Sequence, residues 1–462
     1  MLPFRELRPT AAELREMVRL ASPVVIAQVG IMLMGVVDTA MVGRVSADAV
    51  AAVALGHIYW VNISIPGIGL LMALDPVVSQ AVGAADRDGV RRGVQRGAIL
   101  ACAITIPAML LLLPGEAVFA ALRQPESVAP TAASWARWST LGSLPFFLFV
   151  AFRQSLQAMG TVRPVVIAIV AGNLLNVILN WVLIYGNLGA PAMGAVGSSV
   201  STAIGRWAML LILVWTGRRH VLPALRPWYG ESWRLRPLGR MLAIGAPVAL
   251  QQWLEVAVFA AGAVVIGWFG AKPLAAHEIA INLAATTFMV PLGLSAAAAA
   301  MVGRAVGRGD IAAARRDAVA AIAVGLGFMA IAAVFFLAVP GQLAGVFVAD
   351  AETRAVAAAL VAVAGIFQVF DGVQGVATGV LRGTADTTVP MFIHLAGFWL
   401  VGAPAGLWLA FRAGYGPRGV WFGYVVGLAI VAAALLWRVR WRLARDIERL
   451  RVEETSEFEA VR

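Results

Sequence analysis

Long runs of apolar residues, separated by short segments rich in arginine and glycine, dominate the pattern of this chain. Two examples are the runs from Gly97 to Leu113 and from Val319 to Val339. Each is close to the ~20 residues that a helix needs to cross ~30 Å of hydrocarbon. The pattern predicts about twelve membrane-spanning helices, near residues 20–43, 48–80, 97–114, 131–160, 164–186, 194–217, 241–268, 273–303, 317–340, 354–381, 389–411 and 419–440.

Composition agrees with this interpretation. Of the 462 residues, 61% are hydrophobic and only 13% are charged, and the mean hydropathy is +0.84. Soluble domains carry roughly a quarter charged residues, so this chain could not cover a water-exposed surface with polar groups. Lipid tolerates only backbones that satisfy their own hydrogen bonds, and the alternating ~10-residue strands of a β-barrel are not visible. The predicted fold class is therefore an all-α polytopic membrane protein.

The net charge of +11 is distributed in clusters between the predicted spans. Arginines gather within residues 87–96, 218–240 and 304–316, and the loops between these segments carry few basic residues. Such an asymmetry marks the cytoplasmic side of a membrane protein. We therefore predict a multi-pass protein of the cell (inner) membrane with both termini in the cytoplasm. The expected partners of the arginines are membrane lipids with anionic headgroups rather than nucleic acid.

The second half of the chain repeats the first. A shift of 224 places aligns Pro23 with Pro247, Gly43 with Gly267, Ala81-Val82-Gly83 with Ala305-Val306-Gly307, Asp86 with Asp310, and Arg91-Arg92 with Arg315-Arg316. A shift of 226 places then aligns Pro164 with Pro390. Six spans in each half make the repeats parallel, with a substrate path between them. We predict an N-lobe at 1–217, a basic cytoplasmic linker at 218–240, a C-lobe at 241–441 and a cytoplasmic tail at 442–462.

Three acidic residues are placed deep within predicted spans, where an ionisable group costs at least ~2.5 kcal/mol on insertion scales. They are Asp38 in the first span, Glu255 in the seventh and Asp371 in the tenth. Intramembrane acids usually face a cavity and serve function, so we predict that all three bind a proton or a cation. The alternative is a neutral carboxyl group that only ties two helices together.

Uncharged polar residues accompany these acids on the same helices or in neighbouring spans: Gln251, Gln368, Gln374, Asn173, Asn176, Asn180 and the group Ser198, Ser199, Ser201 and Thr202. We expect Gln251 and Gln368 to support the second-half acids, and Asn176, Asn180 and Ser198 to support Asp38. Such residues also hold membrane helices together without further purpose, and we favour that role for Asn173. Whether His277, Glu278 and Asp75 take part is left open.

The residues point away from enzymatic chemistry. The chain has one lysine, Lys272, and lacks the Gly-x4-Gly-Lys-Ser/Thr pattern that cradles nucleotide phosphates. A single cysteine, Cys102, excludes an internal disulfide and a cysteine-based metal site. We therefore expect neither enzymatic activity nor a cofactor.

Several motifs resemble those of the multidrug and toxic compound extrusion (MATE) transporters. Val37-Asp-Thr-Ala-Met-Val-Gly-Arg44 resembles the motif of the first span. Leu274-Ala-Ala-His-Glu-Ile-Ala-Ile-Asn282 and Pro291-Leu-Gly-Leu-Ser295 resemble the eighth, and Leu381-Arg-Gly-Thr-Ala-Asp-Thr387 resembles the end of the tenth. The resemblance covers nearly the whole chain, and the pairing of Glu255 with Asp371 is similar to the NorM branch.

This resemblance implies a MATE/MOP-type fold and export of organic cations from the cytoplasm, driven by inward H⁺ or Na⁺. It implies a C-lobe ion site at Glu255 and Asp371, and an N-lobe site formed by Asp38, Asn176, Asn180 and Ser198. Where NorM members often carry a tyrosine, this chain has Phe367. Because an oxygen ligand is then missing, H⁺ is favoured over Na⁺ at Glu255 and Asp371.

Two alternatives stay open at this stage. A lipid-linked precursor flippase of the same superfamily would require a more basic central cavity, and a non-transporting scaffold or receptor would not need the buried acids. The substrate expected of the leading hypothesis is a small organic cation. A monomer is expected, since one chain already contains both lobes.

Overall fold

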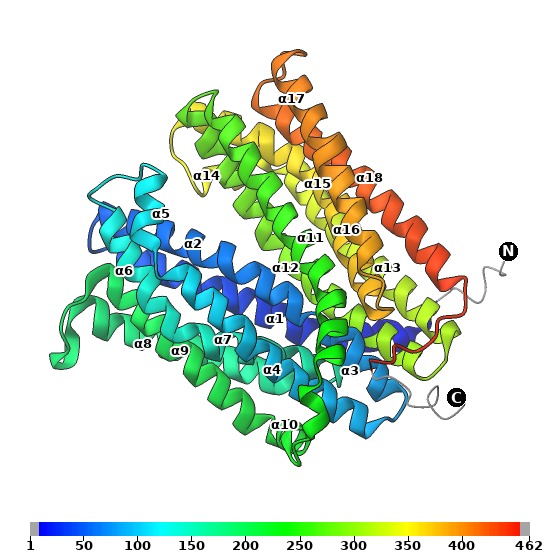
Figure 1. Ribbon diagram of the computed structural model, residues 1–462. Helices are drawn as coiled ribbons and strands as arrows, with labels where there is room; N and C mark the ends of the chain where they lie inside the picture. The colour runs from blue at the N-terminus through cyan, green and yellow to red at the C-terminus, as the bar shows by residue number, and fades with distance from the viewer. Residues whose placement is uncertain (1–8, 453–462) are drawn as a thin grey trace. The chain divides into compact units, whose positions relative to one another are not determined.

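The computed structural model describes residues 9–452, and every regular element in this range is helical (Figure 1). The elements before the basic segment are α1 (Ala11–Val42), α2 (Ala47–Leu71), α3 (Leu74–Gly83), α4 (Arg87–Leu112), α5 (Gly115–Ala121), α6 (Ala129–Ser139), α7 (Ser143–Ala158), α8 (Arg163–Tyr185) and α9 (Gly194–Thr216). They are followed by α10 (Arg218–Leu225), α11 (Leu235–Gly267), α12 (Ala271–Gly307), α13 (Ile311–Ala338), α14 (Pro340–Gly345), α15 (Ala351–Gly383), α16 (Thr388–His394), α17 (Ala403–Phe411) and α18 (Pro417–Leu443).

Eleven helical segments of the described range are long and apolar enough to cross a membrane. The predicted span at 131–160 is not among them because it is divided: α6 and α7 are joined by a 3-10 turn, η2 (Thr140–Gly142). Gly142 has a poor helix propensity, and Pro145 cannot donate a hydrogen bond to the preceding turn. With this divided segment counted, the prediction of an all-helical polytopic membrane fold with about twelve spans is confirmed.

A π-helical turn, η5 (Leu395–Gly402), interrupts the span between α16 and α17. Pro404 lies in the first turn of α17, where its missing N–H removes one helical hydrogen bond. A π-turn accommodates such a gap by adding a residue to the turn. The span from Thr388 to Phe411 therefore stays helical while its register changes in the middle.

The sequence repeat appears in the local structure. Asp86 and Asp310 each begin a helix, and their carboxyl groups accept hydrogen bonds from Gly89 N and Ala313 N, both at 2.8 Å. An acidic N-cap satisfies one of the free N–H groups of a helix's first turn. The same turn chemistry thus starts the third span of each half.

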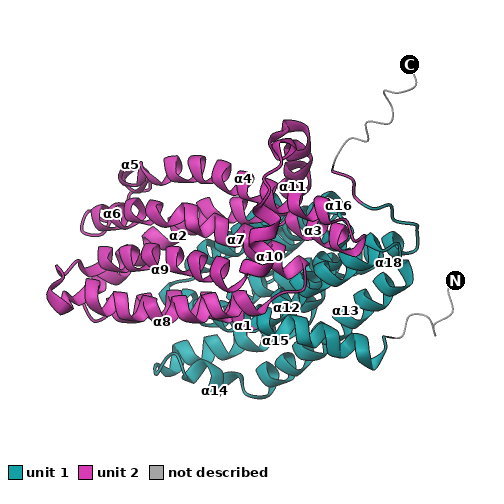
Figure 2. Ribbon diagram, turned by 90° about the horizontal axis from the view of Figure 1, so that it is seen from below, with its two compact units in different colours: residues 1–25, 250–449 teal, residues 26–249, 450–462 magenta. Residues whose placement is uncertain are grey.

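The described chain forms two compact units (Figure 2). Within residues 9–452, unit 1 comprises 9–25 and 250–449, and unit 2 comprises 26–249 and 450–452. These ranges differ from the predicted lobes because the first halves of α1 and α11 are exchanged. Met17 in α1 is buried in the core that α12 and α15 build, whereas Met241 in α11 is buried in the core that holds Leu74.

The predicted linker, 218–240, is held on unit 2 rather than free. It contains α10, a 3-10 turn at Gly230–Trp233 and the first residues of α11. The buried side chain of Gln95 in α4 donates to Ala224 O at 3.1 Å and to Pro227 O at 2.9 Å. Its carbonyl oxygen accepts from Tyr229 N at 3.0 Å and from Ser232 Oγ at 2.7 Å. One fully satisfied amide therefore fixes this segment. The predicted tail, 442–462, begins in α18, and its part beyond 452 lies outside the described residues.

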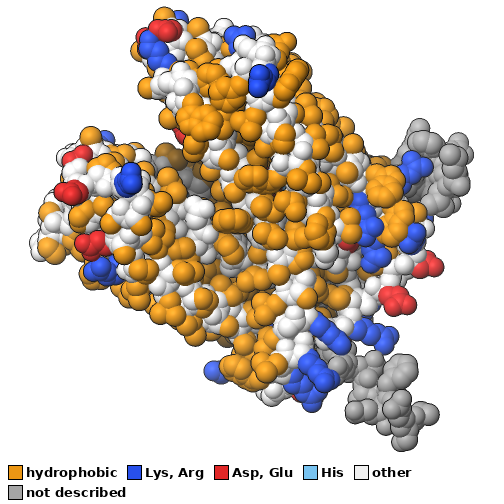
Figure 3. Space-filling model, turned by 45° about the horizontal axis from the view of Figure 1, so that its top comes forward, with side chains coloured by type: hydrophobic (Ala, Val, Ile, Leu, Met, Phe, Trp, Pro, Cys, Tyr) orange, Lys and Arg blue, Asp and Glu red, His pale blue; other side chains and the backbone are white. Residues whose placement is uncertain are grey.

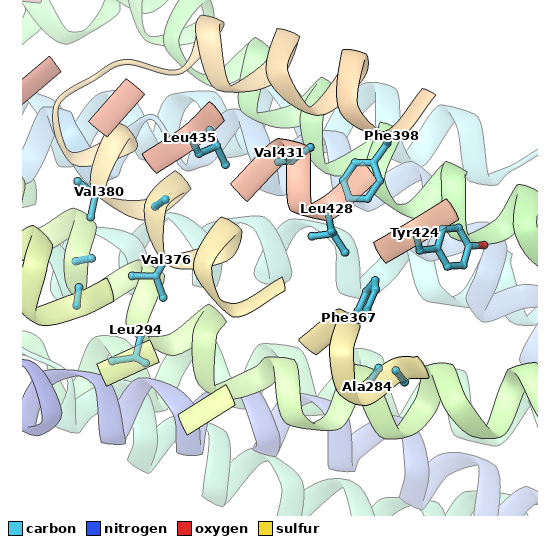
Figure 4. Close-up of a cluster of buried hydrophobic side chains, with 14 of the residues drawn as sticks. Ala284, Leu294, Phe367, Val376, Val380, Phe398, Tyr424, Leu428, Val431 and Leu435 are labelled. Carbon is cyan, nitrogen blue, oxygen red and sulfur yellow. The ribbon is translucent and has the colours of Figure 1, made fainter. Parts of the chain in front are cut away.

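The core of unit 1 consists mainly of small and branched side chains from α12, α15 and α18. Figure 4 shows Leu294, Val376 and Leu428 among them, with an aromatic group that includes Phe367 and Tyr424. On the face that Figure 3 shows, hydrophobic side chains cover most of the surface, and lysine and arginine lie mainly along its margins. This distribution suits a surface that lies in hydrocarbon and ends at two polar interfaces.

Candidate functional site

Unit 2 contains a buried polar cluster around Asp38, which is 7% exposed. Asn180 Nδ2 in α8 donates to Asp38 Oδ1 at 2.6 Å, and Thr202 Oγ1 in α9 donates to Asp38 Oδ2 at 2.8 Å. Each carboxyl oxygen therefore has its own donor from a different helix. Such an arrangement lowers the cost of a charge in an apolar surrounding.

Asn176 completes this cluster. Its Nδ2 donates to Thr202 Oγ1 at 3.3 Å, and its Oδ1 accepts from Asn180 Nδ2 at 3.2 Å. Asn176 and Asn180 are one helical turn apart, which places both amides on the face of α8 that meets Asp38. The structure thus brings together the acid and the two asparagines that the sequence analysis assigned to one N-lobe site.

Ser198 does not join the Asp38 cluster. Its hydroxyl accepts from Trp135 Nε1 at 3.0 Å and donates to Ala195 O at 2.8 Å. Thr202, one turn further along α9, takes the expected place. Asn173 donates to Gly30 O at 3.0 Å and to Ile169 O at 2.9 Å, which is a helix-packing role.

Arg206 in α9 is a buried cation that the sequence analysis missed. It is one turn beyond Thr202 and interacts electrostatically with Asp38. Its guanidinium carbon lies 3.8 Å from the centroid of the Trp60 ring and 5.1 Å from that of Phe146. The available sequence signal was an arginine inside an apolar span, four residues after Thr202.

Unit 1 brings Glu255 in α11 and Asp371 in α15 to one side chain, that of Gln374. Gln374 Nε2 donates to Glu255 Oε1 at 2.9 Å and to Asp371 Oδ1 at 3.4 Å. Asp371 is 5% exposed, while Glu255 is only partly buried. Two acids that share one amide form a pair whose protonation is coupled.

His394 in α16 extends this cluster and was also missed. It is buried, and its Nε2 lies 2.6 Å from Gln374 Oε1 and 3.3 Å from Gln251 Nε2. Its Nδ1 lies 2.8 Å from Pro390 O. The predicted support from Gln251 therefore reaches the acids through His394. The available signal was one of only four histidines, placed inside the eleventh predicted span.

Gln368 lies one turn before Asp371 and ties α15 to α12. Its Oε1 accepts from Thr287 Oγ1 at 2.6 Å. Its Nε2 is buried without a hydrogen-bond partner. Gln368 thus borders the acid pair and holds an unsatisfied donor.

The residues left open by the sequence analysis lie outside both clusters. His277 is buried and accepts from Trp421 Nε1 at 3.2 Å, whereas Glu278 is exposed. Asp75 is buried in unit 2 and interacts electrostatically with Arg153, whose Nη1 donates to Gln28 Oε1 at 3.2 Å.

The acid pair of unit 1 offers few oxygen ligands for Na⁺. Phe367 is buried one turn before Asp371, and its ring packs edge-on against Phe259 and Trp421 at centroid distances of 6.0 and 5.8 Å. Gln374 turns its amide nitrogen toward both carboxyl groups. Within residues 9–452, no group of three or more His, Cys, Asp or Glu side chains is placed to hold a metal ion.

An all-helical chain with many apolar spans and a buried polar cluster in each of two units has the architecture of a polytopic membrane transporter. The MatE family model matches residues 23–182 and 247–408, so its two copies begin at positions 224 residues apart. This spacing equals the shift of the sequence repeat. The chain therefore belongs to the MATE family, whose members are transporters and not enzymes.

Proteins similar to this chain include "Multidrug resistance protein NorM" of Burkholderia vietnamiensis, which is 36% identical over 91% of this chain and 92% of its own length. "Multidrug resistance protein MdtK" of Yersinia pseudotuberculosis is 34% identical over 93% of this chain and 95% of its own. The solved structure of the Vibrio cholerae MATE transporter VcmN in its bent form superposes with a TM-score of 0.82 at 19% identity, over 94% and 98% of the two chains. The fold is thus the twelve-helix MATE fold.

Proposed function

We propose that this chain exports small organic cations and other xenobiotics from the cytoplasm by antiport with H⁺ or Na⁺, with H⁺ favoured. The observation that carries the proposal is the pair Glu255 and Asp371, joined by Gln374 inside the membrane-spanning part of unit 1. A site that exchanges a proton for an organic cation needs carboxyl groups that can hold either one. The relatives that are named multidrug resistance proteins support the class of substrate.

The preference for H⁺ rests on the ligands around the acids. Na⁺ is a hard ion that needs several oxygen ligands, whereas a proton needs one carboxyl oxygen. Phe367, one turn before Asp371, contributes no oxygen, and the amide of Gln374 is the side chain that reaches both carboxyl groups. These contacts favour protonation of Glu255 or Asp371 over Na⁺ coordination.

The Asp38 cluster is proposed as a second station with a different task. It has one acid, three hydrogen-bonding partners and a cation, Arg206, in electrostatic contact. Neutralising Asp38 by a proton or a substrate would leave Arg206 without its counter-charge. Unit 2 could thereby transmit the occupancy of Asp38 to the aromatic rings that surround Arg206.

Arg206 is also the one residue described here that favours the alternative function, a lipid-linked precursor flippase, because a buried cation could bind a phosphate. Its interaction with Asp38 argues against this, since the acid already balances that charge. The remaining parts of the proposal are a monomer in the cell (inner) membrane with both termini in the cytoplasm. Membrane lipids are the proposed partners of the exposed arginines, and no cofactor is required.

Everted membrane vesicles that contain the chain test this function. An imposed proton gradient should drive accumulation of a fluorescent organic cation such as ethidium, and Glu255→Gln or Asp371→Asn should abolish it. Glu278→Gln is the matched control, because this exposed acid lies outside both clusters and should leave accumulation unchanged. If neither a proton nor a sodium gradient moves the cation, the antiport proposal is wrong. A flippase would instead move a fluorescent lipid phosphate in the same vesicles.

A further inference from the structure

Both ring nitrogens of His394 face oxygen atoms that can only accept hydrogen bonds. Nδ1 lies 2.8 Å from Pro390 O, a backbone carbonyl, so Nδ1 must carry a hydrogen. Nε2 lies 2.6 Å from Oε1 of Gln374, a side-chain carbonyl. With this orientation of Gln374, both nitrogens donate, and the ring is a charged imidazolium.

The other end of the same amide makes a matching demand. Gln374 Nε2 can only donate, and it lies 2.9 Å from Glu255 Oε1 and 3.4 Å from Asp371 Oδ1. This orientation of Gln374 therefore allows ionised carboxyl groups on one side, and it requires an imidazolium on the other.

A half-turn of the Gln374 amide gives a second arrangement that is equally complete. Amide oxygen and nitrogen have nearly the same size, so the turn needs little space. The oxygen then faces the carboxyl groups and must receive an O–H from one of them. The nitrogen donates to the lone pair of a neutral His394, and Nδ1–H still donates to Pro390 O. Ionised carboxyl groups together with a neutral His394 would set two acceptors against each other in either orientation of Gln374, at about 1–3 kcal/mol for a buried polar group.

We propose that His394 is a proton-accepting group of the unit 1 site, linked to Glu255 and Asp371 through the amide of Gln374. This inference rests on the proposed proton coupling. When a carboxyl O–H bond breaks, an N–H bond forms at His394 Nε2, and the number of protons in the unit stays the same. The imidazolium then serves as counter-ion of the carboxylate until an organic cation replaces it, and the proton leaves from His394.

The helices packed around His394 contribute few other charges. Gln251 in α11 adds an uncharged amide whose Nε2, which can only donate, lies 3.3 Å from His394 Nε2, so this amide must turn its oxygen to the ring when His394 is an imidazolium. In α18, which contacts α16, Tyr424 places its hydroxyl 3.5 Å from Val258 O, and Arg438 pairs with Asp386 at 2.7 Å. The acidic groups that face the His394–Gln374 pair are therefore Glu255 in α11 and Asp371 in α15.

Nitrogen-15 spectroscopy of the full-length protein in lipid nanodiscs, with labelled histidine, tests the link directly. Ring-nitrogen signals distinguish neutral imidazole from imidazolium, and His394→Gln assigns the signal among the four histidines. At fixed pH, the ratio of charged to neutral His394 should fall about tenfold or more in the Glu255→Gln/Asp371→Asn variant, as expected for groups coupled by at least one pH unit. His277→Gln is the control and should leave both the His394 signal and this fall unchanged.

Gln374→Leu provides the second arm, because it removes the amide and keeps a side chain of similar size. In this background, neutralising the two acids should change the His394 ratio by less than about twofold. The inference is overturned if His394 stays neutral from pH 5 to pH 9 in the unmodified protein. It is also overturned if the ratio of charged to neutral His394 does not change when Glu255 and Asp371 are neutralised. The spectra do not depend on transport, so a failure of the antiport proposal in vesicles would be seen separately.

Discussion

Gly69 in α2 lies directly against Ala249 in α11, so closely that a Cβ on the glycine would stand 2.3 Å from the alanine Cα. Gly293 in α12 lies in the same way against Val25 in α1, where a Cβ would stand 2.9 Å from the valine nitrogen. The two pairs are 224 residues apart in the sequence. The compact units also divide after Val25 and after Ala249. The glycines thus mark the points where α1 and α11 pass from one unit to the other.

The first prediction concerns these two contacts. Gly69→Ala and Gly293→Ala should each lower the thermal unfolding midpoint in detergent, because overpacking a tight contact costs about 1–3 kcal/mol. Gly327→Ala in α13 is the matched control, since a Cβ there meets no atom within 4 Å. Its midpoint should stay the same or rise, because alanine favours a helix over glycine. Equal midpoints for all three variants would contradict the role given to Gly69 and Gly293.

Most of the fold could be predicted because apolar runs of span length allow few structures other than membrane helices. The exchange of the first halves of α1 and α11 between the two units could not be predicted, since the residues before and after Val25 are similarly apolar in the sequence. Only the contacts of particular residues, such as Met17 and Met241, show which core each half joins. The division of the predicted span 131–160 at Thr140–Gly142 could not be predicted either, because one short turn barely changes the hydropathy of its surroundings.

The sequence predicted the partners of Asp38 in α8, because their spacing places them on one face of that helix. Asn176 and Asn180 are one turn apart, so an acid that meets one amide also lies near the other. The choice of Thr202 over Ser198 was not predictable, because it depends on how α9 is rotated about its axis. His394 was missed because a single histidine hardly lowers the hydropathy of its span, and its role depends on the orientation of Gln374.

The second prediction separates Thr202 from Ser198. Thr202→Val keeps the shape of the side chain and removes the donor to Asp38 Oδ2, a hydrogen bond worth about 1.5–3 kcal/mol when the acceptor is charged. Efflux of the organic cation should fall by about tenfold or more. Ser198→Ala removes only contacts to Trp135 and Ala195, so its efflux should stay within about twofold of the unmodified chain. The reverse order of effects would show that Ser198, not Thr202, supports Asp38.

The third prediction concerns the basic segment on unit 2. Gln95→Leu removes the amide that bonds Ala224, Pro227, Tyr229 and Ser232, so the backbone from 224 to 234 should open to protease. Trypsin should then cleave after Arg234 at least several-fold faster in detergent, whereas Arg226 is protected in any case because Pro227 follows it. Gln124→Leu, which removes an exposed amide that bonds only Leu122 O among the described contacts, should not change the rate. Unchanged cleavage in Gln95→Leu would mean that other contacts hold the segment.

The last prediction tests the choice of coupling ion. Phe367→Tyr adds a hydroxyl oxygen one helical turn before Asp371, where a Na⁺ ion at the acid pair could use it as a ligand. Ethidium efflux at fixed pH, compared in Na⁺-containing and Na⁺-free buffer, should give a ratio near one for the unmodified chain and a ratio several-fold higher for Phe367→Tyr. Phe336→Tyr adds the same group to another buried ring of unit 1, which packs beside Gly365 instead of one turn before Asp371, and should keep the ratio near one. A strong dependence on Na⁺ in the unmodified chain would show that Glu255, Asp371 and the existing amides suffice to bind this ion, and the preference for H⁺ would then be wrong.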